Sequence, residues 1–369
     1  MIRKSMLAAL ALPFVTLLIQ RISTLPSAAA AGDDSPKTVP VHLVVTAEPL
    51  QDSGAVAAMT REDVKVKQGK KALPVTAWIP ARGEQAVLQL FIVIDETCNT
   101  SLGQHLGDLK EFINAQPATT WIGLGYARNT TVNLVENLTP DHDRVAKSVR
   151  LPLGAVSAQD SIYLSLVDLM KRWPESKVRR EILIIGDGID RLRGNPYGSG
   201  VTASNPMAAQ SGYEFTQPGM PPPRQPGINP GLMGFSGPYI SPDVDQASLV
   251  AQRTGVILHS IYAPGVGHYG RNYYDMNNGQ NGIAKLADET GGESFFLGFQ
   301  TPVSFKPDLE RLQKILDNQY FLAFEAFPGK KAGLQRVKIW TEVPKAEIVS
   351  ADNVWVPAPA GTAEKKKKG

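Results

Sequence analysis

The stretch Leu88-Gln-Leu-Phe-Ile-Val-Ile-Asp95 decides the fold of this sequence. It is almost continuously apolar, as expected of a strand that is covered on both faces of a sheet. Glu181-Ile-Leu-Ile-Ile185 repeats the pattern and is followed closely by Asp187. Around these strands, apolar residues recur at helical spacing, as in Ile162, Leu166 and Leu169. The alternation predicts an α/β fold with a doubly wound, mostly parallel sheet and helices on both faces.

Segments with β patterning lie on both sides of this α/β region. Residues 38–82 contain an alternating strand and a predicted hairpin with its turn at Gln68-Gly69. Residues 301–358 contain an amphipathic helix followed by three predicted strands, at 320–327, 337–343 and 346–356. Neither flank has enough strands to be stable alone. We therefore predict that the two flanks form one small β-sandwich, with an α/β domain of residues 86–300 inserted between them.

Two stretches of the α/β region lack periodicity. Residues 194–241 are rich in Gly and Pro, which predicts a functional loop or disorder. A second predicted loop, Gly265 to Gly282, carries Tyr269, Tyr273 and Tyr274. Both stretches follow the carboxyl ends of predicted strands, where open α/β sheets bind their ligands. Tyr- and Asn-rich loops suit adaptable recognition of a partner.

The first thirty residues predict a signal peptide rather than a part of the fold. Arg3 and Lys4 precede the apolar run Met6–Ile19, and small residues follow it up to a cleavage site near Ala30. The run is shorter than the roughly 20 apolar residues that a membrane span needs. We predict an exported bacterial protein, periplasmic or secreted, without a membrane span after cleavage. An uncleaved anchor is the alternative.

Charge and cysteine content exclude several classes of function. The formal net charge of +3 comes from the signal segment and from the basic tail 359–369, which we expect to be disordered, so the body is faintly acidic. A nucleic-acid surface is therefore not predicted. Cys98 is the only cysteine, which excludes an internal disulfide, and no histidine has an interpretable spacing to it. With no acid–base pair, catalytic triad or cofactor motif, the sequence predicts a protein that is not an enzyme.

Three motifs resemble those of the von Willebrand factor type A domain. Phe91–Asn99 resembles the family's first strand and metal-site turn. Arg180–Gly188 is similar to its later strand ending in Asp-Gly, and Ala287–Phe296 resembles its closing helix and strand. The flanks Met59–Val64 and Gln319–Phe324 are similar to those of a bacterial exported subgroup labelled von Willebrand factor A-related. The resemblance covers nearly the whole chain after the signal segment.

The resemblance implies a divalent cation at the carboxyl edge of the sheet, Mg²⁺ or else Mn²⁺ or Ca²⁺. Such domains hold it through Asp-x-Ser-x-Ser, a Thr and a second Asp, and a partner's carboxylate completes the shell. The matching positions here are Asp95, Thr97, Asn99, Asp160 and Asp187, with Ser161 as the alternative to Asp160. Hydroxyls have thus been exchanged for an amide and a carboxylate. The alternative is a metal-free remnant, in which Asp95 and Asp187 only cap helices and turns.

The predicted function is binding of a protein or peptide partner through this edge, in adhesion or another protein–protein interaction, with a degenerate metal-ion-dependent adhesion site. A directly bound Asp160 would neutralise part of the cation's charge and weaken its attraction for an acidic partner. Recognition would then depend more on the Tyr-bearing loop Gly265 to Gly282. The alternative function is a structural component of an envelope or surface assembly, built on a metal-free remnant.

Overall fold

The computed structural model describes residues 38–50, 56, 58–192, 240–266, 273–296 and 303–359. The predicted signal peptide, the Gly/Pro-rich insert apart from its last residues, Tyr269 and nearly all of the basic tail lie outside them. Tyr273 and Tyr274 are described only in their backbone. Of the helices in the described part, none combines the length and the apolar character that a membrane crossing requires.

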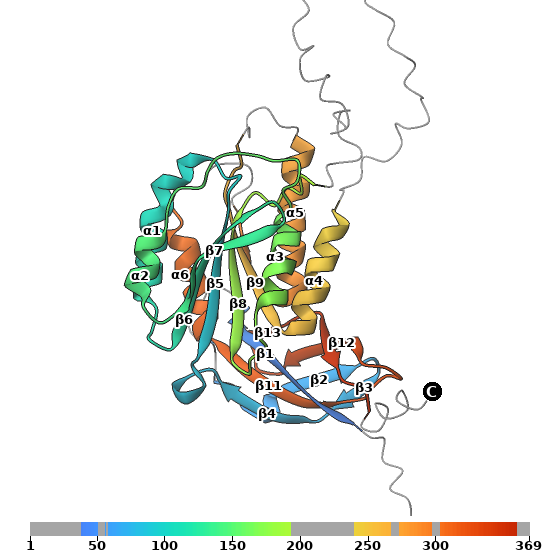
Figure 1. The fold of residues 1–369 in the computed structure, drawn as a ribbon. Helices are drawn as coiled ribbons and strands as arrows, with labels where there is room; N and C mark the ends of the chain where they lie inside the picture. Colours follow the sequence, from blue (N-terminus) through green and yellow to red (C-terminus); the bar gives the residue numbers. More distant parts are fainter. Residues whose placement is uncertain are drawn as a thin grey trace, which may run out of the picture. The chain divides into compact units, whose positions relative to one another are not determined.

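A six-stranded sheet forms the centre of the α/β domain (Figure 1). Its order is β10-β9-β8-β5-β6-β7, and all neighbours are parallel except β6 and β7. This confirms the predicted doubly wound, mostly parallel sheet. The strands are β5 (Leu88–Asp95), β6 (Thr120–Arg128), β7 (Thr131–Thr139), β8 (Arg179–Gly186), β9 (Val256–Tyr262) and β10 (Ser294–Phe295).

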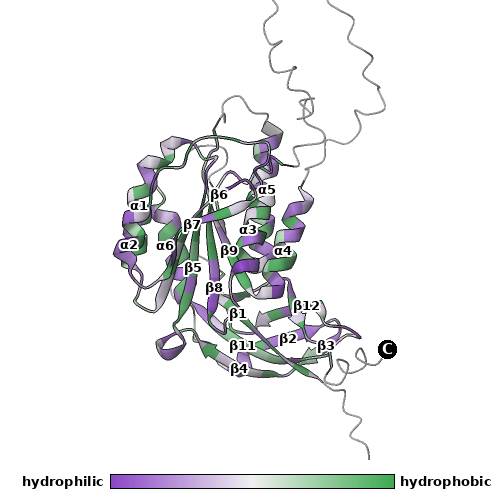
Figure 2. Cartoon of the chain, in the orientation of Figure 1, coloured by the Kyte–Doolittle hydropathy of each residue, from purple (hydrophilic) through white to green (hydrophobic). Residues whose placement is uncertain are grey.

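Helices cover both faces of this sheet. The even-numbered apolar residues of β5 pack with α1 (Leu106–Ala115), α2 (His142–Ser148) and α6 (Lys306–Asp317). Phe91 and Val93 face the opposite side and pack with α3 (Ile162–Arg172), α4 (Pro242–Thr254) and α5 (Tyr273–Thr290). The two core clusters explain why β5 is apolar at almost every position, since successive side chains point to opposite faces. Figure 2 shows that the helices carry both hydrophilic and hydrophobic residues, as surface helices do.

The helix α6 belongs to this domain by its packing, although the sequence groups it with the C-terminal β segment. Its apolar residues are buried against the same face as α1. They are Leu309, Leu312, Ile315 and Leu316. By its packing, this helix therefore covers the six-stranded sheet together with α1.

The two flanks pair strand by strand, which confirms the predicted β-sandwich. One sheet has the order β13-β1-β11-β4 and the other β14-β12-β2-β3, so each contains strands from both flanks. Their inward residues share one apolar core. The strands are β1 (Val39–Pro49), β2 (Val64–Gln68), β3 (Lys71–Leu73), β4 (Val75–Pro80), β11 (Gln319–Ala326), β12 (Gly333–Thr341), β13 (Ala346–Val349) and β14 (Asn353–Val356). Short 3₁₀ helices lie at η1 (Arg61–Asp63), η2 (Gly83–Gln85) and η3 (Thr100–His105).

Two predicted strands are each divided between the sheets of the sandwich. The hairpin around Gln68-Gly69 forms between β2 and β3, but after Pro74 the chain continues as β4 and pairs with β11 in the other sheet. Proline has no amide hydrogen to donate to a ladder, and the Pro74 carbonyl accepts from the amide of Glu325. The predicted strand 346–356 likewise divides into β13, on β1, and β14, on β12.

The predicted loop 265–282 is wrong in its second half, because α5 begins at Tyr273. This part of the helix is rich in Asn and Gly, and glycine lowers helix propensity by about 1 kcal/mol. The segment also lacks an apolar stripe, so its sequence does not indicate a helix. The glycines are needed for close packing. A Cβ added at Gly279 would lie 2.4 Å from the carbonyl oxygen of Asp187, so α5 approaches the end of β8 at backbone distance.

Candidate functional site

Strand order places a ligand-binding position at the ends of β5 and β8. The chain leaves β5 toward β6 and β7 on one side, then returns to add β8, β9 and β10 on the other side. Open α/β sheets bind ligands outside the carboxyl ends of their strands at such a reversal of strand order. Asp95 ends β5, Asp187 follows β8, and their exposed fractions are only 3% and 2%. The structure brings these two residues together at one edge of the sheet, where both lie near Arg191.

A buried arginine joins the two carboxylates. Nη2 of Arg191 lies 2.6 Å from Oδ2 of Asp187, and its Nη1 lies 3.9 Å from Oδ2 of Asp95. Nη1 also donates to Oδ1 of Asp187 at 3.3 Å and to the carbonyl of Ile189 at 3.1 Å. The side chain of Arg191 is only 7% exposed. Its planar, forked guanidinium matches the geometry of a carboxylate, so the three side chains form one buried ion-pair group.

The pKa values of the group reflect burial first and charge second. Burial raises the pKa of Asp95 to about 6, the guanidinium of Arg191 opposes the rise, and the charge of Asp187 adds to it. Burial by itself would lower the pKa of Arg191, but the carboxylates of Asp187 and Asp95 outweigh it and hold the pKa above its usual value. Arg191 is therefore charged at neutral pH.

Thr97 and Asn99 shape the turn after β5. The amide of Thr97 donates to Oδ1 of Asp95 at 2.9 Å, and Oδ1 of Asn99 accepts from the amide of Ser101 at 2.9 Å, where it caps η3. The turn is bound to the segment after β9, since the amide of Asn99 donates to the carbonyl of Pro264 at 2.8 Å. The contacts of Asn99 are thus those of an N-cap.

Asp160 joins the loops of this edge and is fully engaged there. Its Oδ1 accepts from the amide of Asn129 at 2.8 Å, and its Oδ2 accepts from the amide of Ser157 at 2.7 Å. Its carbonyl accepts from the amide of Arg191 at 3.0 Å. The hydroxyl of Ser161, the alternative ligand, caps α3 by accepting from the helix at 3.4 Å. Asp160 therefore positions Arg191 through the backbone while its own carboxylate binds the loops.

These contacts do not fit a divalent ion while Arg191 is in place. The carboxylate of Asp187 is hydrogen-bonded to the guanidinium, and that of Asp95 lies 3.9 Å from it and accepts from the amide of Thr97. The side-chain oxygens of Asn99 and Asp160 accept from backbone amides. Within the described ranges, no three His, Cys, Asp or Glu side chains are grouped so that they could hold a metal. Mg²⁺ needs oxygens at about 2.0–2.1 Å in near-octahedral geometry. Metal binding by this chain remains a prediction.

Arg191 and Gly265 are the site residues that sequence reasoning missed. Arg191 follows Asp187 by four residues in Asp-Gly-Ile-Asp-Arg, and that spacing was the available signal. Gly265 lies against the ion pair from the segment after β9, and a Cβ there would lie 2.1 Å from Oδ2 of Asp187 and 2.8 Å from Nη2 of Arg191. Only a residue without a side chain leaves the pair its space.

An apolar loop, residues 149–160, lies beside this group. It exposes Leu151, Leu153 and Val156, whose exposed fractions are 48%, 53% and 51%. The loop is bound to the end of β5 by Glu96, which is buried and accepts from the amide of Leu153 at 2.6 Å and from the guanidinium of Arg150. That guanidinium also lies over the ring of Tyr126, 3.8 Å from its centroid.

Comparison with known proteins gives structural neighbours only. No family model matches the sequence, and no curated protein matches it. The chain is similar to an aerotolerance-related membrane protein from Bacteroides fragilis, with 10% identity and a TM-score of 0.38 over 62% of this chain and 98% of that one. The conserved hypothetical protein BatB from Bacteroides thetaiotaomicron gives 12% identity and 0.35 over 62% and 97%. The ArnB paralog VWA2 from Sulfolobus acidocaldarius gives 9% identity and 0.34 over 86% and 76%.

The α/β domain has the doubly wound architecture that the resemblance to the von Willebrand factor type A domain implies. Its mostly parallel sheet has an antiparallel edge strand, and the two acidic residues that the motifs supply meet at the carboxyl ends of adjacent strands. The resemblance seen in the sequence is therefore confirmed for the fold. Its implied metal ligands are a separate matter, because of the five only Asp95 and Asp187 have side chains that pair with the guanidinium of Arg191.

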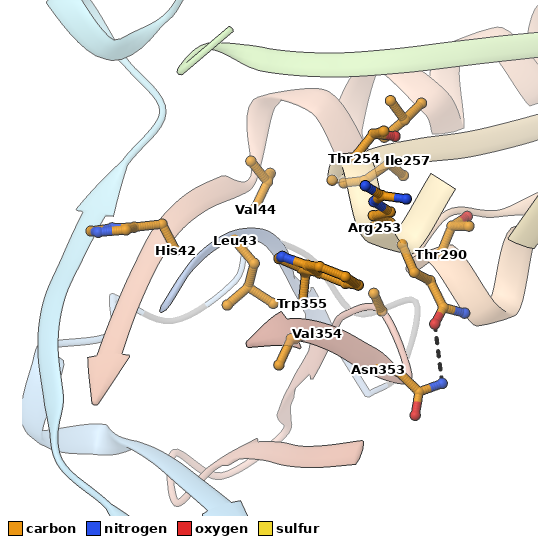
Figure 3. A pocket seen from close by; sticks show the side chains of 14 residues that line it. His42, Leu43, Val44, Arg253, Thr254, Ile257, Thr290, Asn353, Val354 and Trp355 are labelled. Atoms are coloured by element: carbon orange, nitrogen blue, oxygen red, sulfur yellow. Dashed lines mark hydrogen bonds between the residues drawn. The ribbon is translucent and has the colours of Figure 1, made fainter. Parts of the chain in front are cut away.

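A cavity of about 170 Å³ lies at the other end of the strands, between the β-sandwich and the α/β domain (Figure 3). The guanidinium of Arg253, at the end of α4, lies 5.0 Å from the ring centroid of Trp355 on β14. Nearby, Asn353 donates to the side chain of Gln252 at 3.1 Å. These contacts join the two parts of the chain, and we assign this cavity a structural role.

Proposed function

We propose that this chain is an exported binding protein rather than an enzyme, and that it holds a protein partner at the carboxyl edge of its six-stranded sheet. The observation that carries the proposal is the apolar loop, which exposes three large aliphatic side chains next to the ion-pair group. Loops held on a rigid scaffold are where recognition residues concentrate. Exposed apolar patches mark sites of protein interaction.

The loop is suited to binding because its shape is set before a partner arrives. Glu96, which directly follows β5, fixes the amide of Leu153 in the middle of the exposed stretch, and Asp160 fixes the amide of Ser157 just after it. A preorganised loop loses little conformational entropy on binding, which leaves more of the apolar contact energy as affinity. We propose an apolar segment of a protein as the partner, with Leu153 as a central contact.

An acidic partner bound through a metal is less well supported. The two carboxylates at the strand ends already have a cation in Arg191, so a partner's carboxylate would meet a group of net charge −1. Catalysis is also poorly supported, because the thiol of Cys98 is fully buried and burial raises its pKa, with the charge of Asp95 adding to the effect. A thiol in that state is a weak nucleophile.

The test compares two exposed leucines that lie far apart in the sequence. The immobilised protein retains its partner from an envelope or secreted fraction, and the partner is then purified and titrated. We expect Leu153→Asp to weaken binding by at least roughly tenfold, as at an interface hot spot. Leu249→Asp, on α4 and 57% exposed, should leave binding unchanged. Equal binding by both variants and by the wild type would contradict the proposal.

Two further measurements address the broader parts of the proposal. Mass spectrometry of the exported protein is expected to give a new N-terminus close to Ala30, and an intact Met1 would favour the uncleaved anchor. The recovered complex also separates adhesion from assembly. Recovery of one fixed stoichiometric complex would favour the structural component of an envelope or surface assembly, whereas an exchangeable partner favours a binding module.

A further inference from the structure

The carboxyl-edge group contains its own cation. We infer that Arg191 is the resident cation of this site, and that a divalent metal ion binds there only when the guanidinium is removed. The inference concerns the chemistry of the carboxylates and does not rest on the apolar loop or on any partner.

Burial of two carboxylates makes a cation necessary. Asp95 and Asp187 are 3% and 2% exposed, and a buried charge is stable only when it is paired. The nearest cationic atoms are those of Arg191, which approaches Asp187 with both Nη atoms, at 2.6 and 3.3 Å. Its Nη1 also lies 3.9 Å from Oδ2 of Asp95. One guanidinium thus compensates the carboxylates from both strand ends.

Three separate segments are built around the guanidinium. The backbone amide of Arg191 donates to the carbonyl of Asp160 at 3.0 Å, which fixes where the side chain begins. The carbonyl of Ile189 accepts from Nη1 at 3.1 Å, which fixes where it ends. Gly265 leaves the space that the ion pair fills, since a Cβ would lie 2.8 Å from Nη2. An arginine that paired by chance on the surface would have none of these supports.

A metal ion and the guanidinium compete for the same oxygens. A divalent ion binds carboxylate oxygens at about 2.0–2.6 Å. Nη2 already occupies that position at 2.6 Å from Oδ2 of Asp187. Without Arg191, the strand ends would present two buried carboxylates and the nearby hydroxyl of Thr97, which are all hard oxygen donors. The vacated group would carry charge −2 instead of −1, which favours a cation.

Mn²⁺ binding to the purified full-length protein tests the inference. Free Mn²⁺ is measured by electron paramagnetic resonance, and thermal unfolding is followed with Mn²⁺ or with EDTA. We expect the wild type to show no saturable binding and no change in unfolding temperature. Arg191→Ala should bind one Mn²⁺ at least roughly a hundredfold more tightly than the wild type, because a unit charge about 4 Å away has been removed. Its unfolding temperature should rise with Mn²⁺.

Two matched variants locate the ion and cover a failure to fold. Arg191→Ala/Asp187→Asn restores the net charge of −1 but lacks one ligand, so it should lose the gained binding. If Arg191→Ala does not fold even with Mn²⁺, the inference is tested by Mn²⁺ binding to the wild type. Saturable Mn²⁺ binding by the wild type that Asp187→Asn abolishes would overturn the inference. A folded Arg191→Ala that binds Mn²⁺ no better than the wild type would overturn it as well.

Discussion

Gly265→Ala should disrupt the buried ion pair from the outside. Gly265 has no positive φ, so the backbone itself accepts alanine, and the effect of the substitution is steric. The added Cβ would lie 2.1 Å from Oδ2 of Asp187, against a limit of 3.0 Å that real Cβ contacts respect. The carboxylate must therefore move by roughly 1 Å, since overlapping atoms in a dense core cannot both stay in place.

The expected cost follows from two effects. Overpacking of a buried position costs about 1–3 kcal/mol. Moving the Asp187 carboxylate also weakens its 2.6 Å contact with Arg191, and a hydrogen bond to a charged group contributes about 1.5–3 kcal/mol. The overpacking cost and the cost of the weakened contact partly overlap, because movement of the carboxylate relieves the clash. We expect Gly265→Ala to lower the free energy of unfolding by about 2–4 kcal/mol.

Urea denaturation measures the change, with two controls. Gly107→Ala lies on α1 where a Cβ meets nothing within 4 Å, so it should stabilise the protein by up to about 1 kcal/mol through helix propensity. In an Asp187→Ala background, where the clashing oxygen is absent, Gly265→Ala should lose most of its cost. A stability of Gly265→Ala within about 0.5 kcal/mol of the wild type would refute the reasoning.

The remaining predictions concern other buried groups. Cys98 should be alkylated at least roughly a thousandfold more slowly in the native protein than in urea, because burial raises the pKa of its thiol; equal rates would show that the turn is open. His259→Ala leaves Glu181, 2.9 Å away in the core, without its partner and should cost about 3–5 kcal/mol in urea denaturation; a cost under about 1 kcal/mol would contradict this. Glu96→Ala should speed tryptic cleavage after Arg150 by roughly tenfold, and an unchanged rate would mean that other contacts hold the loop.

Much of the fold could be predicted because it depends on patterns that are local in sequence. The apolar run of β5 and the stripes of α3 and α6 each reveal a buried face directly. The division of 346–356 into β13 and β14 could not be read in this way. Both strands are short and apolar at alternate positions, and only their partners, β1 and β12, separate them. The start of α5 was hidden for another reason, since Gly279 serves a close contact with Asp187, and Gly282 one with Tyr163, rather than a helical stripe.

The site was predictable where strand ends determine it and not where loops do. Asp95 and Asp187 follow buried strands, so sheet topology alone brings them together. Asp160 lies in a loop, and one of its carboxylate contacts is with the amide of Asn129, in a distant turn that no spacing in the sequence relates to it. Arg191 carried a signal, its position four residues after Asp187. That signal predicts a pair only once the turn after β8 is known to fold back on the strand end.

A tethered cation and an exchangeable one have different consequences for recognition. A metal ion stabilises its site only in proportion to the logarithm of its concentration above the dissociation constant. Arg191 is covalently part of the turn after β8, so its pairing with Asp187 does not depend on the ions present. A metal also keeps an open position that a partner's carboxylate can fill, whereas the guanidinium is directed at Asp187 and at the carbonyl of Ile189. Under the proposed function and the inference drawn from Arg191, the edge has a constant charge and no coordination bond, so discrimination among partners comes from side chains that lie beside the group. Leu153 is fixed there through Glu96, the residue that directly follows Asp95, so the segment that ends β5 both completes the ion pair and presents the apolar contact.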